Sequence, residues 1–270
     1  MKITQELYKY SMERGVLDVS DLKEFAHKKL GVNYKYLYTK FITRLLSQGK
    51  LVRIRQGLYA AKNVFDPYEK DTDRYIVASK IKSDYYLGFH TALELYGAAY
   101  SEFNSVHVAV LRNSYFQPFV FEGLKYVPVT REVNDVETEV QSITRKDHTI
   151  HVSSPSRTLV DCIDRFELCG GYEEVIKSLQ GLGGVDIGGV IKILDVYDKD
   201  ILNRAVGYIL SVLIDDSPYY GHISEEDLAS IKDRIKKNKR YLVQNTPSKY
   251  VDHWNLYVPK DFESMMEGIQ

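Results

Sequence analysis

The first 62 residues of the chain divide into short segments of regular hydrophobic spacing. Apolar residues recur at helical spacing over 3–14, 20–30 and 33–48, and Ser20 is the expected N-cap of the second helix. Alternating residues around Gln56-Gly57 predict a β-hairpin. Glycine, which tolerates positive φ, ends these segments at positions 15, 31, 49 and 57. Three helices and a hairpin predict a winged helix-turn-helix.

The third predicted helix has two chemically different sides. One side is apolar and belongs to the core: Leu37, Phe41, Ile42, Leu45 and Leu46. The opposite side is polar: Tyr36, Thr39, Lys40, Thr43, Arg44 and Ser47. An α-helix fits the DNA major groove, where lysine or arginine can address guanine and the hydroxyl residues can reach bases or phosphates. This side is therefore the expected DNA-reading surface.

The predicted hairpin adds Arg53, Arg55 and Gln56 to the candidate DNA-binding residues. The two arginines occupy alternate strand positions, so we expect them to point to one face, where a wing meets the phosphate backbone or the minor groove. Two other interpretations stay open. The helix and strand are ordinary solvated surfaces, or the winged helix docks a protein rather than DNA.

Charge is distributed unevenly along the chain. Residues 1–62 contain 13 Lys and Arg against 5 Asp and Glu, whereas residues 63–270 contain 23 against 32. A basic module suits a polyanion, because each neutralised phosphate releases condensed counterions. The charge pattern therefore favours double-stranded DNA as the partner of the N-terminal module.

The first proline, Pro67, lies in a polar stretch that separates the basic module from the rest of the chain. We expect a DNA-binding domain over 1–62, a linker over 63–72 and a second domain over 73–270. Strand-like alternation in SVHVAV, FEGLKYVPV and HTIHVSS, followed by a helix entered through SSP and interrupted at Gly170-Gly171, predicts a mixed α/β second domain. The fold class is therefore α+β overall.

Four segments carry a family resemblance. LVRIRQGLYA, YYLGFHTALELYG, SSPSRTLVDCIDRFELCGG and NRAVGYIL, spread over roughly residues 34–214, resemble the AbiEi family. That family is the antitoxin component of type IV toxin-antitoxin systems and is described as a viral-defence transcriptional regulator. Each motif alone is weak, but the order and spacing of the four make the resemblance more specific.

The resemblance implies both a DNA target and a protein partner. The N-terminal winged helix would bind inverted repeats in its own promoter, as a homodimer, and repress it. The C-terminal domain would antagonise a nucleotidyltransferase toxin. A stand-alone regulator without a toxin is the alternative.

Enzymatic functions find weaker support in the residues. A metal-dependent nuclease is the alternative from another class, and its candidate ligands are Asp161, Asp164, Glu173 and Glu174. These acids are also the expected partners of Arg157 and Arg165. No lysine after residue 62 has an acid two positions before it, and GGVDIGG lacks the second aspartate of a nucleotidyltransferase. We expect no catalytic residue, metal or cofactor.

Two basic features of the second domain remain as tentative partner-binding sites. Arg157 is expected either as a buried clamp on Asp161 or as a contact for a partner. Residues 231–240 carry six bases and one acid, and we expect a basic helix there. Its Lys236, Lys237 and Lys239 would contact DNA, the toxin, or the toxin's nucleotide substrate or RNA target, or would simply face solvent. Cys162 and Cys169 are expected in the core. The polar N-terminus and the absence of long apolar runs predict a cytoplasmic protein without membrane contact.

Overall fold

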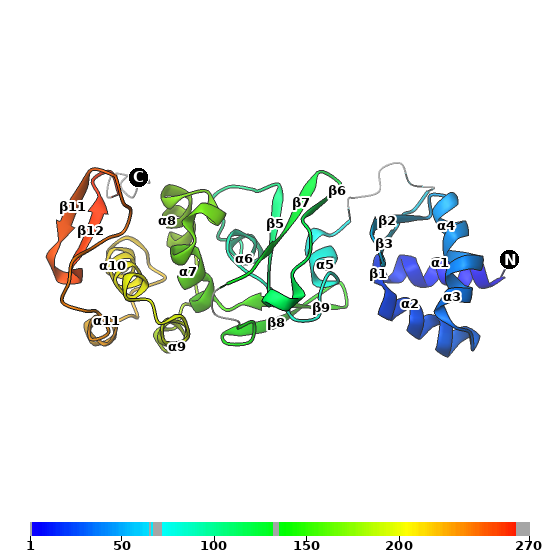
Figure 1. Cartoon of the computed structure of the whole chain (residues 1–270), viewed down its shortest axis with the longest axis horizontal. Helices are drawn as coiled ribbons and strands as arrows, with labels where there is room; N and C mark the ends of the chain where they lie inside the picture. Colours follow the sequence, from blue (N-terminus) through cyan, green and yellow to red (C-terminus); the bar gives the residue numbers. More distant parts are fainter. Residues whose placement is uncertain (1, 65, 67–71, 132–134, 263–270) are drawn as a thin grey trace.

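The computed structural model describes residues 2–64, 66, 72–131 and 135–262. The N-terminal module, residues 2–62, contains helical segments and one sheet in the order of a winged helix (Figure 1). Its helical segments are α1 (Lys2–Arg14), α2 (Val19–Phe25), π-helical η1 (Ala26–Leu30), α3 (Tyr34–Leu37), π-helical η2 (Tyr38–Ile42) and α4 (Thr43–Ser47). Its strands are β1 (Val16–Asp18), β2 (Leu51–Arg55) and β3 (Leu58–Ala61), in the sheet order β1-β3-β2.

The second helix begins earlier than the sequence predicts. Asp18, not Ser20, is its N-cap, because the Asp18 side chain accepts from the Asp21 backbone while the Asp21 side chain accepts from the Asp18 backbone. This reciprocal capping box satisfies two backbone donors that the first turn would otherwise leave unpaired. The three residues before α2, Val16–Asp18, form β1, and this strand is too short for an alternating pattern to be recognised.

The third predicted helix is continuous through α3, η2 and α4. Its apolar side builds the module core: Leu37, Ile42 and Leu45 are completely buried, while Phe41 and Leu46 are half-buried beside them. Asn33 caps its N-terminus by accepting from the Tyr36 backbone. The helical side of the module therefore closes around its own core.

The middle of the chain is a six-stranded mixed sheet in the order β6-β7-β5-β4-β9-β8. Helix α5 (Arg74–Ser79) precedes it, and α6 (His90–Leu95) follows its first strand. The strands are β4 (Tyr85–Leu87), β5 (Ser105–Val110), β6 (Phe119–Phe121), β7 (Leu124–Val129), β8 (Val140–Arg145) and β9 (His148–Ser153), with a short 3-10 turn η3 (Arg112–Ser114) after β5. The three alternating segments identified in the sequence all contribute strands to it.

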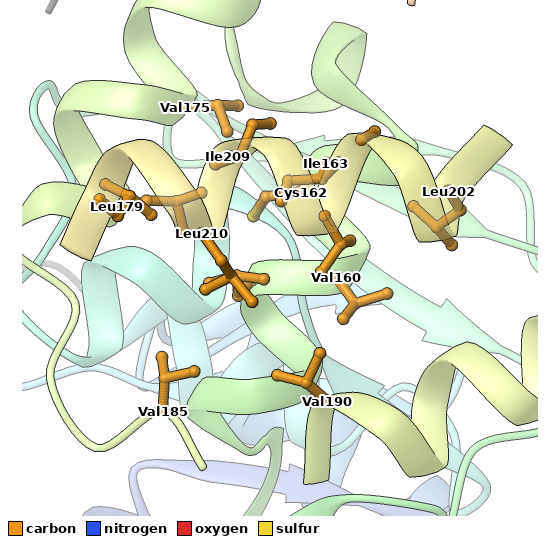
Figure 2. Close-up of a cluster of buried hydrophobic side chains, with 14 of the residues drawn as sticks. Val160, Cys162, Ile163, Val175, Leu179, Val185, Val190, Leu202, Ile209 and Leu210 are labelled. Atoms are coloured by element: carbon orange, nitrogen blue, oxygen red, sulfur yellow. The ribbon is translucent and has the colours of Figure 1, made fainter. Parts of the chain in front are cut away.

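Helices pack behind this sheet and form the largest core. They are α7 (Pro155–Asp164), the 3-10 turn η4 (Phe166–Cys169), α8 (Tyr172–Gln180), α9 (Ile187–Tyr197), α10 (Asp200–Asp216) and α11 (Glu225–Lys232). Ser154 caps α7 with Pro155 in its first turn, and Gly170-Gly171 separates η4 from α8, as expected. Figure 2 shows apolar side chains of α7, α8, α9 and α10 converging. Cys162 and Cys169 are both buried there.

The last described residues form a three-stranded sheet. Its strands are β10 (Arg240–Tyr241), β11 (Ser248–Val251) and β12 (Leu256–Pro259), in the order β10-β12-β11, with a 3-10 turn η5 (Asp252–Trp254) between the last two. The prediction of a basic helix over 231–240 is wrong, because α11 ends at Lys232 and residues 233–239 are not helical. Among the described residues, no helix is long and apolar enough to cross a membrane.

The N-terminal module meets the rest of the chain through its sheet. Val16, Ile54 and Leu58 lie in one buried cluster with Tyr75 and Ile76 of α5. The fold class is confirmed: an N-terminal module of helices and one small sheet is followed by a larger mixed α/β region with several sheets. The boundaries at 62 and 72 stay a prediction.

One close contact in the helical core can be tested by substitution. A Cβ atom on Gly207 of α10 would lie 2.2 Å from the buried indole of Trp254. We expect Gly207→Ala to lower the free energy of unfolding by about 1–3 kcal/mol, because the indole has no free space to move into. Urea denaturation measures the change. Gly221→Ala is the control, since nothing lies within 4 Å of its Cβ position; equal effects of the two changes would contradict this packing.

Candidate nucleic-acid interface

The helix formed by α3, η2 and α4 presents a continuous polar face to solvent. All of the predicted reading residues on it are exposed: Tyr36, Thr39, Lys40, Thr43, Arg44 and Ser47. The sheet of the module lies on the side of the remaining chain, and α3 and α4 lie on the side away from it (Figure 1). A duplex can therefore approach this face without meeting the rest of the protein.

The charges on this face are available for a ligand. Within the part of the chain that the structure describes, no ion pair engages Lys40 or Arg44, and residues 34–47 include no acid. Lysine and arginine bind guanine or phosphate through their N–H groups. The acids of the module lie elsewhere, for example Glu24 in an exposed pair with Lys28 and Asp21 at the junction with Lys80.

The hydroxyl groups on this face have a defined orientation. Thr39 Oγ1 donates to the Lys35 carbonyl oxygen at 2.8 Å, and Thr43 Oγ1 donates to the Thr39 carbonyl oxygen at 2.9 Å. Each oxygen keeps free lone pairs, and both threonines are exposed. This arrangement can accept a hydrogen bond from a base amino group or contact a thymine methyl group.

Arg53 extends the same polar surface from the neighbouring strand. Its side chain is exposed, and its Nη2 donates to Tyr38 Oη at 2.6 Å. Tyr38 belongs to η2, so this bond ties the strand to the reading helix. Gln56 is also exposed, at the turn between β2 and β3. The structure thus brings Arg53 beside the helix, as a phosphate-binding wing residue would lie.

Arg55 does not share that face, and the expectation that it points with Arg53 is wrong. A β-bulge shifts the register between the two arginines, so Arg53 pairs with Tyr59 and Arg55 with Leu58. The Arg55 guanidinium lies 5.4 and 5.2 Å from the ring centroids of Phe116 and Phe119, in the following part of the chain. Its contacts are with protein, not with a surface open to DNA.

Polar contacts also join the N-terminal module to the rest of the chain. Lys80 Nζ lies 2.9 Å from Asp21 Oδ2, and His148 Nε2 lies 2.7 Å from the Arg14 carbonyl oxygen. The hairpin itself is partly covered by the rest of the protein, because Ile54 and Leu58 are buried with α5 and Arg55 packs on Phe116 and Phe119. The sequence gave no signal for these two polar contacts, because the partners are separated by 59 positions in the first pair and by 134 positions in the second.

Arg157 is completely buried. The expectation that it contacts a partner is therefore wrong. Its Nη1 lies 3.1 Å from Asp135 Oδ2, its Nε lies 3.6 Å from Asp161 Oδ2, and its guanidinium lies 4.1 Å from the Tyr86 ring centroid. Of the two interpretations, the buried clamp on Asp161 is the one the structure shows.

Asp161 is the centre of this buried network. Tyr86 Oη donates to its Oδ2 at 2.8 Å, Tyr197 donates to its Oδ1, and Arg131 Nη1 lies 3.1 Å from Oδ1. Burial raises the pKa of both tyrosines, which keeps them protonated as donors. The carboxylate is thus neutralised and hydrogen-bonded by the protein itself.

The acids proposed as nuclease ligands are engaged by other side chains of the protein, and Asp161 and Asp164 share Arg131. Asp164 pairs with Arg131 and Lys199, Glu173 pairs with Lys177, and Glu174 accepts from Ser101. Arg165 pairs with Glu167, not with these acids. Among the described residues, no group of three or more His, Cys, Asp or Glu side chains is placed to hold a metal.

Lys236, Lys237 and Lys239 are exposed, on a loop rather than on a helix. The loop backbone is fixed, since Asp200 accepts from the Lys236 amide and the buried Arg204 donates to the Lys236 carbonyl oxygen. The lysine side chains are therefore presented from a positioned segment.

Residues 6–62 match the model of a family described as "Transcriptional regulator, AbiEi antitoxin". This match confirms the family resemblance over residues 6–62, which include the first of the four quoted motifs. No curated protein matches the sequence. Over its whole length the fold resembles the crystal structure of the RV2827C protein from Mycobacterium tuberculosis, with a TM-score of 0.66 and 12% identity over 99% of this chain and 93% of that one.

The buried network predicts a large difference between two arginines. Arg157→Ala removes one cation from a buried carboxylate, so we expect a loss of about 3–5 kcal/mol in the free energy of unfolding. Arg165→Ala breaks the exposed pair with Glu167 and should cost less than about 1 kcal/mol. Urea denaturation of the full chain measures both, and similar costs would disprove a clamping role for Arg157.

Proposed function

We propose that this protein is a transcriptional repressor that binds duplex DNA through the exposed face of α3, η2 and α4 and regulates its own promoter. The observation that carries the proposal is the uninterrupted polar face around Lys40 and Arg44, free of acids and directed away from the rest of the chain. The AbiEi family match over the same residues supports it.

The recognition helix has the composition needed to read bases. Lys40 and Arg44 would address guanine, while Thr39 and Thr43 would contact neighbouring bases through their oxygens and methyl groups. Arg53, held beside Tyr38, would contact a phosphate and set the position of the helix without reading sequence. Arg55 has no direct role on DNA in this proposal.

The operator we propose is an inverted repeat bound by two copies of the chain. Two symmetric copies place their recognition helices in successive major grooves about 34 Å apart, which matches one helical turn of DNA. Beyond DNA binding, we propose that the protein acts as an antitoxin against a nucleotidyltransferase toxin, without catalysing a reaction itself. The matched family is described as an antitoxin, which supports this second role.

Base reading and phosphate binding should respond differently to substitution. Lys40→Ala and Thr43→Ala should cost roughly 1–3 kcal/mol on the preferred operator and broaden the selected consensus. Arg53→Ala should weaken binding to all sequences alike and flatten the salt dependence by about 0.9 log units per log unit of salt. Arg55→Ala is the matched control and should leave the affinity and the salt dependence unchanged.

The measurement is in vitro selection followed by affinity titration at several salt concentrations with the full chain. A consensus for Lys40→Ala identical to that of the wild type would move recognition off this helix. A complete absence of DNA affinity at low salt in the folded wild-type chain would disprove the proposed function.

The antitoxin role is separable from repression. A Lys40→Glu, Arg44→Glu double variant should lose operator binding but still protect cells from a cognate toxin expressed from an independent promoter. Colony survival measures protection, and the wild-type chain is the reference. Loss of protection in the double variant, with its abundance and fold intact, would mean that protection acts through repression alone.

A further inference from the structure

Three tyrosines form a row across the C-terminal sheet. In the strand register Tyr241 of β10 pairs with Tyr257 of β12, and Tyr257 pairs with Tyr250 of β11. The rings of Tyr241 and Tyr257 are stacked, with centroids 4.4 Å apart and planes 13° apart, and Tyr250 lies 4.9 Å from Tyr257. Neighbouring strand positions such as Leu256 are completely buried, so the tyrosines occupy the opposite face from the core.

The ring stack is open at the edge strand. Tyr241 is 50% exposed. On the sheet, β10 pairs with β12 on one side only. A further planar ring could therefore continue the stack on Tyr241.

A cation lies on the same face. Lys239 Nζ lies 4.2 Å from the Tyr250 ring centroid, and the exposed Lys236 and Lys237 precede it in the same short loop. Within the described part of the chain, no ion pair engages Lys236 or Lys237. Their loop is fixed by hydrogen bonds of the Lys236 backbone with Arg204 and Asp200, and it leads directly into β10.

We propose that this tyrosine face, defined by Tyr241, Tyr250 and Tyr257 with the loop 236–240, binds single-stranded RNA. Aromatic rings beside cations are the combination that binds unpaired nucleic acid, because every base has a face for stacking and every nucleotide carries a phosphate. Bases in a duplex are already stacked on each other and do not offer a face to Tyr241. RNA supplies most unpaired loops and strands that proteins recognise in this way.

The tyrosine face is distinct from the proposed DNA-reading helix. The two lie at opposite ends of the molecule, with the sheet of β11 and β12 at one end and the N-terminal module at the other (Figure 1). One ligand bound at the reading helix therefore leaves the tyrosine face accessible. The acidic balance of residues 63–270 makes the local excess of bases at 231–240 more notable.

The test uses the full chain and a fluorescently labelled, unstructured 12-nucleotide RNA. We expect Tyr241→Ala to weaken binding about tenfold or more, and Tyr241→Phe to retain it, because phenylalanine keeps the stacking face without the hydroxyl group. Lys236→Glu with Lys237→Glu should weaken binding and reduce its salt dependence. Tyr219→Ala, another exposed tyrosine, is the matched control and should bind like the wild type.

A second arm keeps this inference independent of the proposed function. The Lys40→Glu, Arg44→Glu variant, which should lose operator DNA, should still bind the RNA. Equal affinity of wild type and Tyr241→Ala for RNA, with both folded by thermal unfolding, would overturn the proposal. So would loss of RNA binding in the Lys40 and Arg44 variant alone, or equal affinity for a DNA strand of the same sequence.

Discussion

The apolar contact between the N-terminal sheet and helix α5 determines what the N-terminal module presents to solvent. Val16, Ile54 and Leu58 are removed from water there together with Tyr75 and Ile76. Because one side of the module is used for this contact, the opposite helical side is the one that remains exposed. The same contact covers part of the hairpin, which turns Arg55 into a structural residue and leaves Arg53 at the surface.

The motifs that carried the family resemblance have structural roles in this chain. Ser154 caps α7, and Arg157 and Asp161 within the same motif belong to the buried ion network. In NRAVGYIL, Arg204 fastens the loop at Lys236 and Gly207 makes room for Trp254. The residues of these segments therefore stabilise the fold. The residues offered for recognition lie largely outside them, on the third helix and on the C-terminal sheet.

The chain separates its two proposed nucleic-acid surfaces by distance and by type. The helix face suits a groove, since its polar residues project from one continuous cylinder. The tyrosine face suits unpaired bases, since its rings are already stacked and open at one edge. A mixed sheet and a helical core lie between them, held by buried contacts such as those around Asp161.

The sequence by itself determined the elements whose signals are local. The periodicity of Leu37, Ile42 and Leu45 defined the third helix of the N-terminal module and its exposed side. The Ser154-Pro155 pair defined the start of α7, because caps and helical spacing act within a few residues. Charge counts likewise separated a basic module from an acidic remainder.

Only the tertiary structure decided features that depend on residues far apart in the chain. The bulge in β2 and the packing of Phe116 and Phe119 redirected Arg55, although alternation placed it beside Arg53. The row of tyrosines arises from strand register between β10, β11 and β12, which no local pattern encodes. The motif around Arg157 allowed either burial or a partner contact. Asp135 and Tyr86, which are distant in sequence, enclose its guanidinium together with Asp161 of the same helix, and Arg157 is therefore buried.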